Sequence, residues 1–259
     1  MQTHPELHAQ ARLALACLDL TSLNDNDAEL DVARLCARAQ GRFGPVAAVC
    51  VWPRFATFAR RLLPAHIAVA AVANFPEGLS DAQRAVRDTC EIVQAGAQEV
   101  DLVLPYRALL AGDETACREL LRAVRHACEG RVLKVILETG ELREPATIER
   151  ASRLALDAGA DFLKTSTGKT RIGATPLAAV AMLRTIAADA KARGRVGFKA
   201  SGGIRSVADA ALYVDLVERE LGAAALLPAR FRIGASALLN DIETVLGGSA
   251  SANAADGRY

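Results

Sequence analysis

Eight short runs of apolar residues recur along the chain, separated by longer amphipathic stretches. Runs of this length, rich in Val, Ile, Leu and Ala, are typical of strands buried on both faces, whereas the stretches between them carry helix signals. We expect Ser80 to cap a helix over residues 81–93 that ends near Gly96, and residues 24–27 to open the helix after the first strand. The expected strands cover residues 14–20, 46–52, 66–74, 99–104, 131–138, 161–166, 196–201 and 229–236.

A repeated strand–helix pattern of this kind predicts an α/β fold with a parallel sheet. Eight repeats with no Pro/Gly/Ser linker between them match the size and element count of a single-domain (β/α)8 TIM barrel. We expect the barrel, with a short N-terminal helical segment, over residues 1–247 and a flexible tail over residues 248–259. A doubly wound open sheet is the alternative, but no G-x-G-x-x-G follows any of the first four strands.

Composition limits the partners more than it limits the fold. The 259 residues are 51% hydrophobic and 24% charged, with a formal net charge of +1, so the chain lacks the basic field of a nucleic-acid-binding protein. It also lacks an apolar run of about 20 residues that would span a membrane. The six cysteines contain no C-x-x-C, and the four histidines complete no zinc spacing. We therefore expect a cytoplasmic protein without metal that binds a small molecule.

Lysine is rare in this chain and unusually placed. There are five lysines against 26 arginines, yet Lys134, Lys164 and Lys199 all fall within predicted strands. Arginine is always charged, whereas a buried amine beside another cation can lose its proton and attack a carbonyl to form a Schiff base. The alternative is that each lysine is paired with a carboxylate in a structural network.

Three further polar or reactive residues lie in predicted strands. Asp101 can move a proton at the carbon next to an imine, although a lone strand aspartate is more often an ion-pair partner. The same ion-pair interpretation applies to Asp19. Cys50 is expected to pack in the core, because no histidine nearby in sequence would activate its thiol.

The segment 165–170 ends in Gly-Lys-Thr, as a P-loop does, but the glycine that motif requires five positions before Gly168 is replaced by Leu163. Gly168 and Lys169 can still bind a phosphate through backbone N–H groups and one cation. Loops after the seventh and eighth strands of such barrels frequently complete a phosphate site. They contribute Gly202, Gly203, Gly234 and Ser236. A phosphorylated substrate is therefore favoured.

Seven motifs together resemble the deoxyribose-phosphate aldolases, which are class I aldolases on a TIM barrel. The motifs are LDLT (18–21), VCVWPRF (49–55), EVDLVLPYR (99–107), LKVILETGEL (133–142), FLKTSTGK (162–169), GFKASGGIR (197–205) and RIGAS (232–236). The resemblance implies reversible cleavage of 2-deoxy-D-ribose 5-phosphate to D-glyceraldehyde 3-phosphate and acetaldehyde, a step of deoxyribonucleotide catabolism. It also implies that no metal or organic cofactor takes part, and family members are often homodimers.

The resemblance also assigns residues. Lys164 matches the Schiff-base lysine, and Lys199 matches the second lysine, which lowers the pKa of the first and assists proton transfer. Asp101 matches the general acid/base and Lys134 a supporting lysine. Positions matching phosphate contacts are Gly168, Lys169, Gly202, Gly203, Gly234 and Ser236, and further residues expected to line the site are Asp19, Cys50 and Thr167.

Two positions near the C-terminus bear on this resemblance. Ala237 stands where many members have a second serine, which removes one hydroxyl donor from the phosphate site. Tyr259 matches a C-terminal tyrosine that in some members enters the active site, where a phenol can relay a proton; the alternative is an unused chain end. Rival functions are another Schiff-base barrel enzyme, such as a transaldolase-like transferase, and a catalytically silent phosphate-binding protein.

Overall fold

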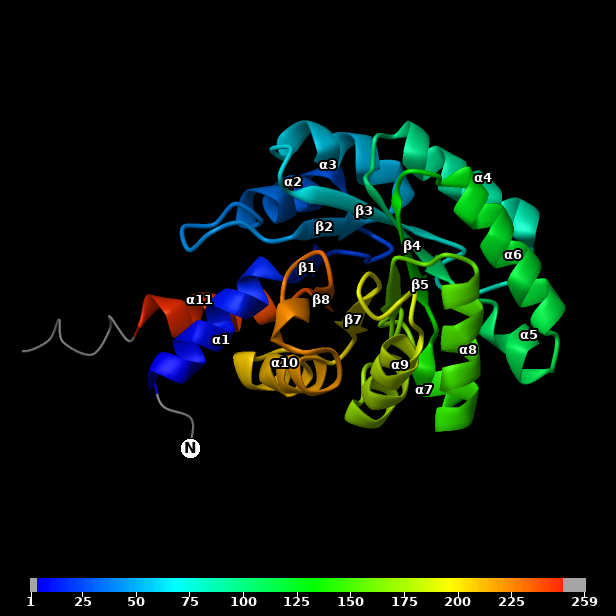
Figure 1. Ribbon diagram of the computed structural model, residues 1–259. Coiled ribbons are helices and arrows are strands. Elements are labelled where there is room, and N and C mark those ends of the chain that lie inside the picture. The colour runs from blue at the N-terminus through cyan, green and yellow to red at the C-terminus, as the bar shows by residue number, and fades with distance from the viewer. Residues whose placement is uncertain (1–3, 249–259) are drawn as a thin grey trace, which may run out of the picture.

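A closed barrel of eight parallel strands forms the centre of the computed structural model, which describes residues 4–248 (Figure 1). Each strand pairs with the next in sequence, and the last pairs with the first. The strands are β1 Leu18–Thr21, β2 Ala48–Val51, β3 Ala68–Ala73, β4 Glu99–Val103, β5 Val132–Ile136, β6 Phe162–Lys164, β7 Gly197–Ser201 and β8 Phe231–Ala235. The predicted (β/α)8 barrel is therefore confirmed.

Helices follow the strands and form the outer layer of the molecule (Figure 1). They are α1 His4–Ala16, α2 Glu29–Arg38, α3 Ala56–Leu62, α4 Ala82–Gln94, α5 Tyr106–Leu110, α6 Glu114–Ala127, α7 Thr139–Leu142, α8 Pro145–Asp157, α9 Pro176–Ala188, α10 Val207–Leu221 and α11 Leu238–Gly247, with 3-10 turns η1 Pro53–Phe55 and η2 Ala223–Ala225. Because helices cover the barrel, its strands are buried on both faces and read as continuous apolar runs. Within residues 4–248, no helix combines the length and apolar character that a membrane crossing requires.

The first predicted strand is wrong at its start. Residues 14–16 belong to α1, and β1 begins at Leu18. The run from Leu13 to Leu18 is apolar throughout, and a short apolar run does not distinguish a buried helix end from a strand. Ala11, Ala14 and Leu15 are buried, so α1 uses these residues to pack onto the barrel.

Two predicted helix starts are displaced by one or a few residues. The cap of α4 is Asp81 rather than Ser80, since its side chain accepts a hydrogen bond from the Arg84 backbone N–H. Residues 24–27 form a turn instead of opening α2, because Asp27 Oδ2 accepts hydrogen bonds from the Asn24 N–H and the Ser22 hydroxyl. Helix α4 ends before Gly96, as predicted, and Gly96 has a positive φ.

Strand register sets the height of the polar side chains inside the barrel. The Cα atoms of Lys164 and Lys199 are partners across β6 and β7, and those of Asp101 and Lys134 are partners across β4 and β5. Neighbouring strands lie about 4.8 Å apart, so long side chains from adjacent positions meet in the barrel interior. The fold thus brings Lys134, Lys164, Lys199 and Asp101 together inside the barrel.

Candidate active site

Lys164 and Lys199 converge on a single oxygen atom. The Nζ atoms of both lysines lie 2.8 Å from Oδ2 of Asp101. All three side chains are at most 2% exposed, so water screens their charges only weakly. The predicted adjacency of the two lysines is therefore present, and Asp101 joins them.

Lys134 and Asp19 lie next to this group. Lys134 Nζ is 2.8 Å from the other Asp101 oxygen, Oδ1, and 3.2 Å from Asp19 Oδ2. Lys199 Nζ also contacts Asp19 Oδ2, at 2.5 Å. Lys134 is thus an ammonium surrounded by carboxylates, and Asp19 is the ion-pair partner that its sequence context suggested.

The pKa values of the three buried lysines shift in different directions. Burial lowers the pKa of Lys164, and the neighbouring Lys199 adds to that effect, so that the opposing pull of Asp101 is outweighed. For Lys199, burial also acts to lower the pKa, but Asp101 and Asp19 together raise it above the ordinary value. The pKa of Lys134 is raised well above its usual range by Asp101, Asp19 and Glu99, despite burial. Lys164 is therefore the lysine most readily present as a neutral amine.

Asp101 is held as an anion. Burial alone would raise the pKa of its carboxyl group, but Lys134, Lys164 and Lys199 hold it well below the usual value. Cys50 lies nearby, with Sγ 4.0 Å from Asp101 Oδ2. Burial and the Asp101 charge raise the pKa of this thiol, so Cys50 remains protonated and packs against the site as predicted.

A cavity of about 340 Å³ opens beside these residues, at the carboxyl ends of the strands. Its walls come from the loops after β1, β6, β7 and β8, and its lining residues include Thr167, Gly168, Lys169, Gly202, Gly203, Gly234, Ser236 and Ala237. All six predicted phosphate contacts thus border one cavity. Gly168, Gly202 and Gly203 have φ values of 79°, 88° and 86°, a conformation that favours glycine.

Gly234 connects this cavity to the lysines. A Cβ atom at this position would lie 2.7 Å from Ser201 Oγ and 3.0 Å from Lys199 Cε. A side chain would therefore displace Lys199 or close the cavity. Behind Gly234, Ala237 precedes α11 and provides no side-chain cap, which leaves the helix N-terminus suited to an anion.

Glu138 organises the loop that carries Gly168 and Lys169, a role that the sequence did not reveal. Its carboxylate accepts hydrogen bonds from the Thr167 hydroxyl at 2.5 Å and the Thr170 hydroxyl at 3.2 Å. Thr167 Oγ1 in turn accepts from the Lys169 N–H at 3.0 Å. Glu138 is buried and has a φ of 55°, and burial raises the pKa of its carboxyl group.

Glu99 and Arg232 also belong to the buried polar group but were not predicted. Glu99 contacts Lys134 Nζ at 2.5 Å, and Arg232 binds both Glu99 and Asp19. Glu99 stands two residues before Asp101, so strand periodicity places both on one face. The spacing could therefore have predicted from the sequence that Glu99 lies on the same face of β4 as Asp101. Tyr259 lies outside the described residues, and its predicted role is untested.

Known proteins that are similar to this chain in sequence or structure are described as aldolases. Residues 13–243 match the family model described as "DeoC/LacD family aldolase". A deoxyribose-phosphate aldolase from Agrobacterium fabrum (strain C58) is 47% identical over 250 residues, which cover 95% of each chain. A structure of a putative deoxyribose-phosphate aldolase from Toxoplasma gondii ME49 superposes with a TM-score of 0.86 at 25% identity, covering 96% of this chain and 98% of that one.

A more distant structure, described as a tetrameric deoxyribose phosphate aldolase from Aeropyrum pernix, superposes with a TM-score of 0.71 at 26% identity and covers 93% of this chain and 97% of its own. The family model spans most of the barrel, from the end of α1 into α11, and the curated relative matches nearly the full length. The chain therefore belongs to the DeoC/LacD family of aldolases.

Proposed function

We propose that this aldolase cleaves 2-deoxy-D-ribose 5-phosphate reversibly to D-glyceraldehyde 3-phosphate and acetaldehyde, with Lys164 as the Schiff-base residue. The observation that carries the proposal is the shared contact of Lys164 and Lys199 with Asp101 Oδ2. It combines a neutral nucleophile, a cation that keeps it neutral and a carboxylate beside the reacting atoms.

The first half of the reaction makes an electron sink. Neutral Lys164 Nζ attacks the aldehyde carbon C1 of the open-chain sugar, and loss of water yields a protonated imine. The C2–C3 bond then breaks, and its electron pair becomes the C1=C2 bond of an enamine on Lys164. Asp101, acting through a water, accepts the proton of the C3 hydroxyl, so that C3 becomes the aldehyde carbon of glyceraldehyde 3-phosphate.

The second half regenerates the enzyme. The proton held by Asp101 returns to C2 of the enamine, and water hydrolyses the resulting imine to acetaldehyde and the free Lys164 amine. The Lys199 ammonium, 2.8 Å from the same carboxylate, offsets its changing charge through both halves. Lys134 supports the site by holding Asp101 Oδ1 at 2.8 Å.

The phosphate of the substrate fits the cavity at the carboxyl ends of the strands. Its glycine-rich walls let backbone N–H groups approach an anion, and Lys169 adds a cation. Ser236 contributes a hydroxyl where Ala237 does not. The residues assigned to this subsite are Gly168, Lys169, Gly202, Gly203, Gly234 and Ser236.

Reductive trapping tests the proposal directly. The protein is incubated with acetaldehyde and sodium borohydride, and the adduct is located by peptide mapping and mass spectrometry. We expect an ethyl group on the peptide that contains Lys164, and none on the Lys164→Arg variant, because a guanidinium does not lose its proton and cannot form the imine. No adduct on folded wild-type protein would favour a silent phosphate-binding protein.

Donor specificity separates the proposed activity from other Schiff-base aldolases and from transaldolase-like transferases. We expect addition of acetaldehyde to glyceraldehyde 3-phosphate, whereas efficient use of dihydroxyacetone or its phosphate as donor would favour a rival. A homodimer and a cytoplasmic location remain predictions, of which the first is measured by light scattering on the purified protein.

A further inference from the structure

A network of buried ionisable side chains extends from the lysines toward the amino ends of the strands, which form the base of the barrel. Its members are Asp19, Glu99, Asp101, Lys134, Lys164, Lys199 and Arg232. Each side chain is at most 8% exposed, so the charges act on one another with little screening. Arg232 is the member farthest from Lys164 along these contacts, and Glu99 connects it to Lys134.

Arg232 is held by four contacts. Its Nη1 atom lies 2.6 Å from Asp19 Oδ1 and 3.2 Å from Glu99 Oε2, its Nη2 atom lies 2.7 Å from Glu99 Oε1, and its Nε–H donates to the Pro228 carbonyl. Such a fork fixes both carboxylates in place. Asp19 and Glu99 are in turn bound to Lys199 and Lys134.

The charges of this network cancel when Lys164 is neutral. It holds three carboxylates, Asp19, Glu99 and Asp101, and three cations besides Lys164. Those cations are Lys134, Lys199 and Arg232. A protonated Lys164 would leave an uncompensated positive charge inside the barrel, and a buried unpaired charge is costly. The balance of carboxylates and cations in the network therefore influences whether Lys164 is neutral.

We propose that Arg232 and Glu99 are positioning residues that set the charge of the buried network and thereby keep Lys164 a neutral nucleophile. They touch neither the substrate cavity nor Lys164, and they act through Asp19, Lys134 and Lys199. The inference rests on the proposed function, because it assigns the two residues to the imine-forming step.

The groups around Lys164 are consistent with this role. Lys164 faces Asp101 from β4, Lys199 from β7, Cys50 from β2 and, at longer range, Glu138 after β5. Replacing Arg232 or Glu99 changes the total charge of the network and leaves Cys50 and Glu138 in place. Cys50 is a thiol with a raised pKa, and its charge is zero in either case.

The groups around Arg232 keep it charged and add no charge that titrates with it. Asp19 and Glu99 outweigh the effect of burial and raise the pKa of the guanidinium, so that it is a permanent cation. Burial raises the pKa of the nearby Cys17 thiol to about 12, and it carries no charge either. Because a lysine at this position would not hold both carboxylates in a fork, the arginine is suited to the role.

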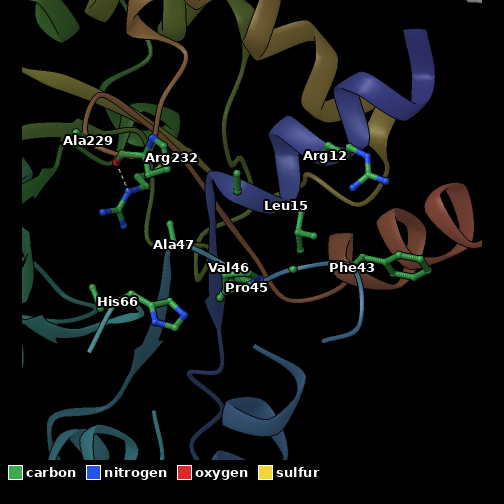
Figure 2. A pocket seen from close by; sticks show the side chains of 13 residues that line it. Arg12, Leu15, Phe43, Pro45, Val46, Ala47, His66, Ala229 and Arg232 are labelled. Carbon is green, nitrogen blue, oxygen red and sulfur yellow. Dashed lines mark hydrogen bonds between the residues drawn. The ribbon is translucent and has the colours of Figure 1, made fainter. Parts of the chain in front are cut away.

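A cavity of about 590 Å³ gives solvent access to Arg232 from the base of the barrel. Figure 2 shows Arg232 at its edge, and His66, Val46 and, from α1, Leu15 are among the other lining residues. Three lining residues belong to α1, which precedes β1, and the others precede or begin β2, β3 and β8, so this cavity is at the amino ends of the strands, opposite the substrate cavity. A small cation can reach the site of Arg232 by this route without entering the active site.

Two substitutions with opposite effects on network charge provide the test. Arg232→Met removes a cation, which we expect to raise the pH at which Lys164 becomes reactive by about one unit; Glu99→Gln removes an anion and lowers that pH by a similar amount. At a pH below the midpoint, the rate of imine formation then differs about tenfold from wild type in opposite directions. The double variant restores the charge and returns the midpoint to the wild-type value.

The measurement is the rate of reductive trapping of acetaldehyde as a function of pH, each variant being compared with wild type at the same pH. Arg34→Met is the control, since it removes an exposed arginine whose ion-pair partner, Asp31, lies outside the network. If the two residues have only a structural role, both single variants trap acetaldehyde more slowly than wild type and the double variant traps it more slowly than either. That result would overturn the proposal. Failure of wild-type protein to trap acetaldehyde would instead refute the proposed function.

Chemical rescue guards against misfolding of the variants. In Arg232→Ala, millimolar guanidinium chloride is expected to restore trapping through the basal cavity several-fold, with no effect on wild type or on Glu99→Gln. Circular dichroism establishes that the variant is folded. Folded Arg232→Ala protein with a wild-type pH midpoint, or with no response to guanidinium, would overturn the proposal.

Discussion

Replacing Lys199 by Met is expected to convert Lys164 into an ammonium at neutral pH. Both amine nitrogens lie 2.8 Å from one oxygen of Asp101, so they are at most twice that distance, 5.6 Å, apart. At an effective dielectric constant of about 20, two unit charges at this separation repel by about 3 kcal/mol, which corresponds to about two pKa units. Asp101, relieved of one partner, attracts a proton on Lys164 in the same direction.

The sign of the effect follows from the role of the neutral amine. The pKa of Lys164 is lowered in the native protein, so its reactive form is present at lower pH than for an ordinary lysine. Raising that pKa moves the acidic limb of the activity profile to higher pH. We expect kcat/KM at pH 7 to fall about 100-fold and to recover largely at alkaline pH.

The assay is the rate of deoxyribose 5-phosphate cleavage from pH 5 to 10. Lys191→Met is the matched control, because Lys191 is an exposed lysine outside the network. If Lys199→Met lowers the cleavage rate by the same factor at every pH and does not shift the profile, Lys199 acts in proton transfer. Its charge then does not set the pKa of Lys164, which refutes the repulsion mechanism.

Four further outcomes are expected. Lys164→Arg abolishes turnover, and measurable residual cleavage would contradict the scheme. Ala237→Ser lowers KM for the phosphorylated substrate about twofold to tenfold through one added hydroxyl, and an unchanged KM would exclude that contact. Gly140→Ala weakens substrate binding and lowers the melting temperature, because its Cβ would overlap the carbonyl oxygen of Ile172, which follows the loop that carries Gly168 and Lys169; unaltered values would show that the loop adjusts. Deleting Tyr259 slows exchange of the acetaldehyde methyl protons, whereas full activity and normal exchange would remove it from the mechanism.

The barrel itself was predictable because its strands are buried on both faces. Each apolar run is bounded by polar helical sequence, and the order of runs leaves little choice of topology. The error at residues 14–16 arose where a buried helix end continues directly into β1. Helix starts were less secure, because Ser80 and Asp81 are both good caps and only the hydrogen bond to Arg84 distinguishes them.

The position of the lysines was predictable from composition, but their charge was not. Their scarcity and their place within apolar runs marked Lys134, Lys164 and Lys199 together. Which of them is neutral depends on how many carboxylates each one meets, and those contacts cross strands far apart in the sequence. Lys134 contacts Asp19, Glu99 and Asp101 and keeps its proton. The ion-pair partner of Lys164 is Asp101, which also contacts Lys134 and Lys199.

Arg232 is the one buried arginine among residues 4–248, and its fixed charge matters for Lys164. A catalytic lysine in a buried network stays neutral only if the charges at the far end of that network remain constant while Asp101 accepts and returns a proton. Arg232 cannot lose its proton under these conditions, and its fork keeps Asp19 and Glu99 paired at the base. With that end of the network fixed, the proton most easily released is the one on Lys164, at the end that opens toward the substrate. The division between a fixed arginine and a titrating lysine thus explains why this arginine-rich chain keeps lysine in its barrel.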